Sequence, residues 1–462
     1  MQKTAQLGTE NIGKLLIKLG IPASIGFVAI TIYNLTDTLF VGKFIGPLAI
    51  AAVAIAGPVS VLIAAMGYVL GVGGSSIISR ALGAKDEAKA SHVFGNQIVF
   101  SLIFSFVMMG VGWLLEKEAL TLFGARGAIY PHAVAYFRIV LVAGIPFLTF
   151  NSMARGVINA LGKTQTSMKF SMISAVINII LDPIFIIALD WGIEGAAIAT
   201  TLAFMVETAL MLRFFLSGKE AITIQKKYFK LNWPIVKEML GIGISALANQ
   251  VVMSAMIIVL NYSLFKYGKE NGVAIYGIIN RFYMLFFIPI MAVEAGFRPI
   301  VGYSYGANNM DRVKKSIKTA LNYSMLTCLV LVIGIVSTSH WFIHLFTDEP
   351  FIIEHTPYAL NMVIALAPLL ALEMISVALF QSINKPKLAI IQLVFKYAIL
   401  VIPMVLILPI YFSWQGIIYA FPIAEFFAAL LTIWLLMQEF KVLNQRMASS
   451  TLQKEKVVVS ED

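Results

Sequence analysis

The chain has 462 residues, of which 59% are hydrophobic and only 13% are charged, and its mean hydropathy is +0.87. Soluble domains carry about 25% charged residues, so this composition excludes a water-soluble protein. The single cysteine, Cys328, excludes a disulfide framework, and the formal net charge is +10.

Apolar segments follow one another along the chain, and each is long enough to cross a hydrocarbon core of about 30 Å as a helix. The breaks between them carry Gly, Pro or charged residues, as in Gly83-Ala84-Lys85-Asp86, which predicts tight turns between helices. The fold class is therefore all-α integral membrane, with 12 transmembrane helices. The predicted spans are residues 14–37, 48–70, 94–115, 134–158, 168–188, 194–216, 236–262, 273–299, 317–338, 358–382, 389–410 and 414–438.

The basic residues concentrate in alternate loops. Most of the 34 Lys and Arg residues fall at the N-terminus, in every second loop, in the long central loop and in the tail. Cytoplasmic loops of membrane proteins carry such an excess, so the N- and C-termini are both expected in the cytoplasm. Topology thus explains the basic balance, and no nucleic acid partner is needed.

The chain also repeats itself at an offset of about 222 residues. Gly83-Ala84-Lys85-Asp86 recurs as Gly306-Ala307-Asn308-Asn309, and Ile145-Pro146-Phe147 recurs as Ala367-Pro368-Leu369. Six helices per half is an even number, which predicts a parallel internal repeat of two six-helix lobes. The expected domains are an N-lobe at 1–216, a flexible cytoplasmic linker at 217–236, a C-lobe at 237–440 and a cytoplasmic tail at 441–462. Two joined bundles are typical of an alternating-access transporter with its substrate between them.

Two aspartates in the first half lie at membrane depth, where a charge costs at least about 2.5 kcal/mol. Asp37 lies about 22 Å beyond Pro22 at 1.5 Å per residue, so it is either a carboxylate at the outer interface or part of a cation or proton site. Asn178 and Asp182 lie one turn apart on one helix face, and Pro183 frees a backbone carbonyl beside them. That stretch is either an Asp-Pro turn at a helix end or a site for a small hard cation or a proton.

Other charged residues in the spans are weaker candidates, each open to a structural or a transport role. Arg281 is expected to be a partner of Glu294 or Glu373, and Arg155 lies near a cytoplasmic end, from which it can snorkel. The remaining ones are Glu207, Glu425 and Lys396.

Catalytic motifs are absent from the sequence. It contains no Gly-x-x-x-x-Gly-Lys-Ser/Thr phosphate loop and no His-Glu-x-x-His zinc motif. A membrane enzyme needs a clustered nucleophile or metal set, so we expect no enzyme and no cofactor beyond a coupling ion.

Three stretches together resemble a known family: Asn-Leu-Thr-Asp-Thr-Leu-Phe-Val-Gly (34–42), Gly-Val-Gly-Gly-Ser-Ser-Ile-Ile-Ser-Arg-Ala-Leu-Gly-Ala-Lys-Asp (71–86) and Asn-Ile-Ile-Leu-Asp-Pro-Ile-Phe-Ile (178–186). They look like the multidrug and toxic compound extrusion (MATE) transporters, close to the MepA-like bacterial branch. The resemblance covers residues 12 to 440. It implies two lobes in a V shape, antiport of organic cations or amphipathic toxins against H+ or Na+, a monomer, and a bacterial cytoplasmic (inner) membrane location.

The resemblance also assigns roles to individual residues. It implies a coupling-ion site, with Na+ as the only metal, and a first helix that bends at Pro22. One departure is that the seventh helix, Ser245 to Val251, lacks the acid that some members place there for a C-lobe site. The implied coupling residues are Asp37, Asn178, Asp182, Thr200 and Asn151, and the candidates for substrate contact are Tyr33, Asn34, Glu294, Glu373 and Arg281.

We therefore expect a secondary active multidrug efflux antiporter coupled to H+ or Na+, with small-molecule drugs and membrane lipids as its partners. The alternative is a lipid-linked oligosaccharide flippase of the same superfamily. That task favours a basic cavity, whereas the interior candidates here are mainly acidic.

Overall fold

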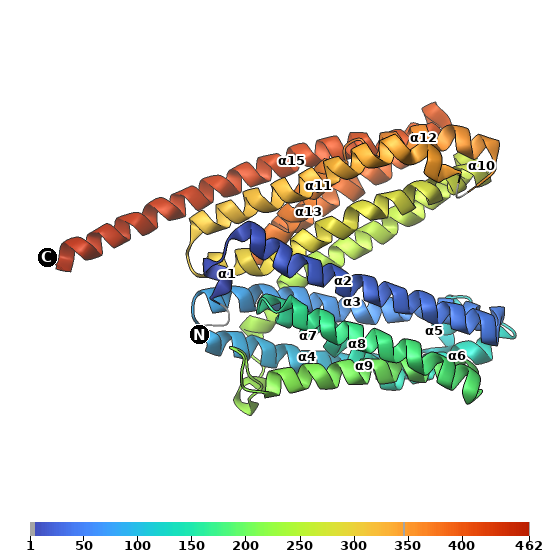
Figure 1. Cartoon of the computed structure of the whole chain (residues 1–462), viewed down its shortest axis with the longest axis horizontal. Coiled ribbons are helices and arrows are strands. Elements are labelled where there is room, and N and C mark those ends of the chain that lie inside the picture. The colour runs from blue at the N-terminus through green and yellow to red at the C-terminus, as the bar shows by residue number, and fades with distance from the viewer. Residues whose placement is uncertain (1–4, 345–346, 462) are drawn as a thin grey trace. The chain divides into compact units, whose positions relative to one another are not determined.

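The computed structural model describes residues 5–344 and 347–461, and side chains within these ranges except those of 56–64, 141–142 and 450–461. The described chain is helical (Figure 1). Its elements are α1 (Gln6–Thr9), α2 (Ile12–Phe40), η1 (Val41–Ile45), α3 (Pro47–Gly83), α4 (Glu87–Leu114), α5 (Glu116–Leu122), α6 (Ile129–Ile139), η2 (Val140–Gly144), α7 (Ile145–Ala160), α8 (Thr164–Pro183), η3 (Ile184–Ala188), α9 (Gly192–Leu216), η4 (Lys226–Phe229), α10 (Trp233–Gly306), α11 (Met310–Ile343), α12 (Pro350–Ile364), α13 (Ala367–Ser382), α14 (Pro386–Leu393), η5 (Val394–Val401) and α15 (Ile402–Glu461).

Seven of the described helices are long and apolar enough to cross a membrane, or up to eight if α12 and α13, which meet at a 41° bend, form one span. Every apolar segment predicted from the sequence falls within this helical chain. Large apolar side chains such as Ile258 and Leu39 are about 70% exposed on the helices. A surface of this kind is stable against lipid and not against water. The structure is thus that of a multi-pass membrane protein.

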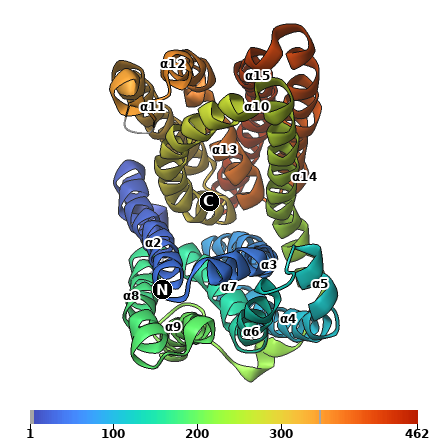
Figure 2. The same ribbon diagram turned by 90° about the vertical axis from the view of Figure 1, so that its right-hand side faces the viewer.

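Two of the predicted turns are breaks inside long helical assignments. A straight α10 of 74 residues would be about 110 Å long, but it reverses at Lys269, where φ is 50° and ψ is −146°. Ser413 breaks α15 in the same way, with φ 54° and ψ −148°. In Figure 2, which looks at the molecule from its side, the two arms of α10 are separate helices.

The internal repeat is visible in the turns. Asp86 caps α4 by accepting a hydrogen bond from the Lys89 amide at 2.8 Å, and Asn309 caps α11 in the same way through the Arg312 amide at 3.0 Å. Positive φ angles also recur at corresponding positions of the two halves. The pairs are Gly46 and Lys269, Lys85 and Asn308, Gly162 and Asn384, and Asp190 and Ser413.

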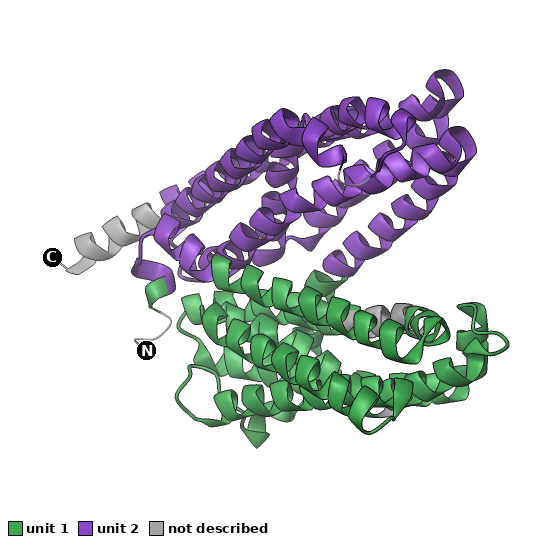
Figure 3. Ribbon diagram, turned by 45° about the vertical axis from the view of Figure 1, so that its right-hand side comes forward, with its two compact units in different colours: residues 1–6, 21–244 green, residues 7–20, 245–462 purple. Residues whose placement is uncertain are grey.

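The chain forms two compact units. Unit 1 comprises residues 1–6 and 21–244, and unit 2 comprises residues 7–20 and 245–462 (Figure 3). The division therefore falls inside three helices, between Gln6 and Leu7 in α1, between Gly20 and Ile21 in α2 and between Ile244 and Ser245 in α10. The expected lobes placed α1 and α2 wholly in the N-lobe and began the C-lobe at residue 237 of α10, whereas the units share all three helices.

Unit 1 is a helical bundle around α3 and α7, which pack along each other, with α4, α6 and α9 against them. Its core contains Val41, Phe137 and Ile145, all at most 3% exposed. These three residues come from η1, α6 and the start of α7. The same core therefore fixes the helix ends that carry the polar residues described below.

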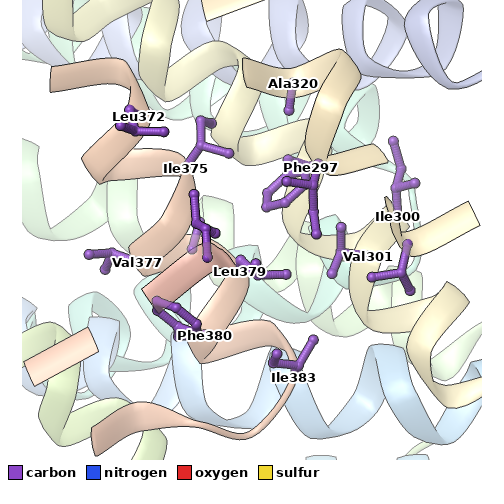
Figure 4. Packing of buried hydrophobic residues seen from close by; sticks show 14 of the residues in the cluster. Phe297, Ile300, Val301, Ala320, Leu372, Ile375, Val377, Leu379, Phe380 and Ile383 are labelled. Atoms are coloured by element: carbon purple, nitrogen blue, oxygen red, sulfur yellow. The ribbon is translucent and has the colours of Figure 1, made fainter. Parts of the chain in front are cut away.

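Unit 2 has its own core, in which α13 packs against α11 and α15. Phe297 and Phe380 are fully buried and lie across the cluster from each other with Ile375 between their helices (Figure 4). This packing positions α13, which also carries Glu373.

The linker is packed against unit 1. Asn96 of α4 donates a hydrogen bond to the Lys230 carbonyl at 3.3 Å and accepts one from the Asn232 amide at 2.7 Å. Ile222 is fully buried. The linker, which was expected to be flexible, is thus held against α4 by the C-terminal part of the linker.

Candidate functional site

A polar cluster lies in unit 1 where α2, α8 and α9 approach one another. Asp37 is contributed by α2, Asn178 and Asp182 by α8, and Thr200 and Thr201 by α9. The Asn178 amide donates to Asp182 Oδ1 at 3.4 Å and to Thr200 Oγ1 at 3.3 Å. The spacing predicted Asn178 and Asp182 on one helix face, and their hydrogen bond confirms it.

Three π-helical turns surround this cluster. η1 follows the helix of Asp37, η3 begins directly after Pro183, and η2 joins α6 to α7; all three pack against α9, and η1 packs against η3. Pro183 lacks an amide proton, so the backbone beside Asp182 cannot keep a regular hydrogen-bond ladder. Single π-turns are frequent at functional sites, and three of them lie around this cluster.

The acids of this cluster are buried without compensating charge. Asp182 is fully buried and Asp37 is 7% exposed, and neither forms a salt bridge within the described residues. The two carboxylates are close enough to repel each other. Buried oxygen atoms also lack a hydrogen-bond donor at four positions: Asp37 Oδ1, Asn178 Oδ1, Asp182 Oδ2 and Thr201 Oγ1.

Such an arrangement is costly unless something positive fills it. A buried polar atom without a partner costs about 1–3 kcal/mol, and more when it is charged. Two carboxylates, an amide oxygen and a hydroxyl are hard oxygen ligands that suit a small cation, and either acid can instead take up a proton. The cluster fits Na+ and H+ equally well by this chemistry.

Tyr136 of α6 lies near the acids and was not predicted for this role. It is 8% exposed and lies in electrostatic range of both Asp37 and Asp182. A tyrosine in an apolar segment gives no sequence signal, because its side-chain direction depends on packing between helices. Thr201, next to Thr200 on α9, supplies one of the unpartnered oxygens.

Asn151 lies apart from this hydrogen-bonded set. It donates to the Phe204 carbonyl at 3.0 Å and accepts from Thr208 at 2.7 Å, so α7 and α9 satisfy it. Tyr33 is in electrostatic range of Asp37, Arg155 and Glu207. Asn34 is exposed and donates to the Ile30 carbonyl of its own helix.

The other membrane-depth acids are paired, in contrast to the two aspartates. Glu207 of α9 bonds Arg155 of α7 at 2.6 Å and also accepts from Ser171 of α8 at 3.0 Å. Glu294 pairs with Arg298 one turn later on α10 at 2.5 Å. The pairing of Arg155 shows that it is more than a snorkelling side chain.

In unit 2, Glu373 bonds Lys396 at 2.5 Å, and Lys396 also bonds Glu425 at 2.7 Å. The expected partners of Arg281 thus have other basic partners in the structure, and Arg281 itself is exposed on α10. Pro22 is buried in α2, two residues beyond the last α2 residue that belongs to unit 2. Among the described residues, no group of three or more His, Cys, Asp and Glu gathers as a metal site.

A family model described as MatE matches the chain twice, over residues 22–184 and 245–407, in agreement with the internal repeat. The chain is similar to the multidrug export protein MepA of Staphylococcus aureus strain N315, being 27% identical over 432 residues that cover 93% of this chain and 95% of that protein.

Solved structures also resemble the chain. A crystal structure of MATE in the bent conformation has a TM-score of 0.91 at 27% identity and covers 97% of this chain and 99% of that one. The outward-facing conformation of a multidrug resistance MATE family transporter of the MOP superfamily has a TM-score of 0.87 at 27% identity, with 96% and 99% covered.

Proposed function

The chain belongs to the MatE family, whose members are transporters and not enzymes, and on this premise we propose that it exports organic cations or amphipathic toxins in exchange for H+ or Na+. The cluster around Asp37 and Asp182 is the coupling site. Asn178 and Thr200 complete it, and Thr201 adds a hydroxyl. The substrates are small-molecule drugs of the kind that the name of its relative MepA describes.

One observation carries this proposal. Among the membrane-depth acids, Asp37 and Asp182 lack a salt bridge within the described part of the chain, whereas Glu207, Glu294, Glu373 and Glu425 each have one. A structural acid at membrane depth is paired, because an isolated charge there is costly. Two acids without a salt bridge, each with one buried oxygen that lacks a donor, are therefore suited to bind a mobile cation or proton.

Binding of the ion is linked to a bend in the first helix. Neutralising Asp37 and Asp182 removes their mutual repulsion, which lets α2 move relative to α8. Pro22 provides a weak point in α2, since it removes one backbone hydrogen bond, and α2 passes from unit 2 to unit 1 beside it. Each charge moved across the membrane is worth about 2.3 kcal/mol per 100 mV, enough for tens of fold of accumulation of a neutral substrate.

The proposed topology has twelve spans in two six-helix lobes, with both termini in the cytoplasm of a bacterium and a single chain as the working unit. The Lys-rich and Arg-rich loops support this orientation. The reversals at Lys269 and Ser413 support it as well, because each divides a long helix into two arms.

The test is efflux of a fluorescent cation such as ethidium from proteoliposomes, driven by a pH gradient alone and then by a Na+ gradient alone. Asp37→Asn and Asp182→Asn remove the charges while keeping the shape of the side chains. We expect one gradient to drive efflux in the parent and both variants to fall to the protein-free rate.

Asp190→Asn is the matched control. Asp190 is exposed in the turn between η3 and α9 and has a φ of 52°, which asparagine adopts readily. Its efflux should equal that of the parent. Undiminished efflux in both site variants would contradict the coupling role of unit 1, and absence of any cation transport in the parent would favour the oligosaccharide flippase.

A further inference from the structure

A second charged cluster lies inside unit 2. The Lys396 ammonium lies between the carboxylates of Glu373 and Glu425, at 2.5 and 2.7 Å. All three side chains are buried, with 6–8% of their surface exposed. The cluster holds two acids and one base, so it carries one negative charge in excess when all three groups are ionised.

Three separate elements converge to build it. Glu373 comes from α13, Glu425 from α15, and Lys396 from η5, an eight-residue π-helical stretch. The π-helical backbone is uncommon and is found frequently at functional sites. Lys396 also lies against the Tyr397 ring, with its nitrogen 5.5 Å from the ring centre, which is within cation–π distance.

A neutral polar layer holds these elements in register. Gln392 donates to Ser376 and to Thr432 at 2.6 Å each, and Ser376 donates to the Gln392 oxygen at 2.9 Å. Ser376 lies one turn from Glu373 on α13, and Gln392 lies one turn before Lys396. The helices that carry the two glutamates are thus joined by contacts that do not involve Lys396.

The acids keep binding capacity that Lys396 does not use. Glu373 Oε1 and Glu425 Oε1 are both buried and have no hydrogen-bond partner. A carboxylate offers about four lone-pair sites, whereas a single ammonium with three protons cannot reach all of those present here. A plain structural ion pair would need only one of the two acids.

The positions in unit 1 that correspond to Glu373 and Lys396 are neutral. The residue about 222 positions before Glu373 is Asn151, and the one before Lys396 is Ser174. Asn151 donates to the Phe204 carbonyl, and Ser174 donates to the Ala203 carbonyl at 3.0 Å. The ion pair that joins α7 to α9 in unit 1, Arg155 with Glu207, lies one turn away from Asn151, so the cluster of unit 2 is not repeated at the same positions.

We propose that unit 2 contains a binding site for a primary ammonium group, formed by Glu373 and Glu425, in which Lys396 of the chain itself is the resident cation. The lysine fills the place that an external cation would take. The site is closed to external ions while Lys396 is present and open to a small alkylammonium when its side chain is removed. This inference concerns binding within unit 2 and is independent of the proposed coupling at Asp37 and Asp182.

The test removes the resident cation and supplies a substitute. Lys396→Ala in the full-length protein leaves a space the size of n-propylammonium, and engineered cavities bind ligands of matching shape. Thermal unfolding is measured in detergent with n-propylammonium chloride or with tetramethylammonium chloride at equal ionic strength. We expect n-propylammonium to raise the unfolding midpoint of the variant on the order of 2–4 °C relative to its effect on the parent.

Two further variants keep the result interpretable. Lys396→Ala with Glu373→Gln retains one acid and the same formal charge as the parent cluster, so it is expected to fold and to respond more weakly. Adding Glu425→Gln removes both acids, and the response should disappear. An equal response to tetramethylammonium, a response that persists without both acids, or no response in either lysine variant would overturn the proposal.

Discussion

The ion pair of Arg155 and Glu207 shows how unit 1 compensates a charge that is buried at membrane depth. Glu207 is 2% exposed and accepts from both Arg155 and Ser171, so its carboxylate is well compensated. The Arg155 side chain keeps 23% of its surface exposed. Loss of Arg155 and loss of Glu207 should therefore lower the free energy of unfolding by different amounts. An arginine at that exposure can reach polar surroundings, and the buried glutamate cannot.

We predict that Arg155→Ala lowers the free energy of unfolding by about 3 kcal/mol, since it leaves the Glu207 carboxylate buried with only a neutral donor. Glu207→Gln alone should cost less. The double variant, Arg155→Ala with Glu207→Gln, should recover most of the loss. Denaturant or thermal unfolding in detergent measures all three, and an Arg155→Ala protein as stable as the parent would show that the pair does not hold α7 to α9.

At this scale, the sequence predicted the residues whose significance follows from local spacing. Asn178, Asp182 and Pro183 share one stretch of helix, and Asp37 is a rare charge in an apolar run. Ion pairs between residues on different helices could not be predicted from the sequence. Lys396 is 23 residues from Glu373, and nothing local to either residue indicates that the other is its partner.

At the scale of elements, the first sections of α2 and α10 make the same kind of contact, in which a glycine packs closely against the backbone carbonyl of a neighbouring helix. A Cβ atom on Gly243 of α10 would overlap the carbonyl of Val69, and one on Gly73 of α3 would overlap the carbonyl of Met239; these contacts lie in unit 1. In unit 2, Gly20 meets the Ala292 carbonyl and Gly296 meets the Leu16 carbonyl in the same manner. The four glycines occupy the corresponding positions of the repeat.

These contacts anchor the first section of each helix. Residues 12–20 of α2 belong to unit 2, and residues 233–244 of α10 belong to unit 1. At both places the backbones approach closely at the glycines, as is common where membrane helices meet through small residues. An added methyl group must separate the helices or distort them.

We predict that Gly73→Ala and Gly243→Ala each lower the free energy of unfolding by about 1–3 kcal/mol through overpacking. Fluorescence-detected size-exclusion chromatography after a heating series gives the change in stability for each variant in detergent.

The matched control is Gly241→Ala, because Gly241 lies on the same helix and a Cβ there meets nothing within 4 Å. Its alanine should be neutral or stabilising by up to about 1 kcal/mol, which is the difference in helix propensity. Equal losses at Gly241 and Gly243 would point to glycine flexibility in α10, and the contact with Val69 would then not be the cause.

The elements themselves were predictable, but their interruptions were only partly so. Long apolar runs and Gly or Asn turns predicted the helices and the turns at Asp86 and Asn309. The π-helical stretches η1, η2, η3 and η5 have no sequence signature, since a π-turn differs from an α-turn only by one inserted residue in the hydrogen-bond ladder.

At the scale of the whole molecule, the chain passes between the units within helices, and the linker belongs wholly to unit 1. The predicted lobes followed from counting six helices in each half. The division of α2 at Gly20 depends on a contact with Ala292, near the far end of α10. Only long-range packing decides this, so no local pattern in residues 12–40 indicates it.

The proposed orientation of the whole chain is testable with the help of its single cysteine. Cys328 is fully buried in α11, so a membrane-impermeant maleimide should leave the parent unlabelled in intact cells. Lys269→Cys lies at the break of α10, which is expected outside, and Lys219→Cys lies in the linker, which is expected inside. We predict that Lys269→Cys is labelled in intact cells and that Lys219→Cys is labelled only after the membrane is permeabilised.

The two sites differ by one passage of the chain through the membrane, along the first arm of α10, so they must report opposite sides if that arm spans. Positions 219 and 269 are both exposed, so a cysteine at either position is accessible to the reagent once the reagent reaches that side of the membrane. Labelling of both from one side would mean that the arm from Trp233 to Lys269 does not cross, and the even count of six spans per half would fail. Labelling of Lys219→Cys alone from outside would keep the helices but invert the chain, which would contradict the cytoplasmic placement inferred from the basic loops.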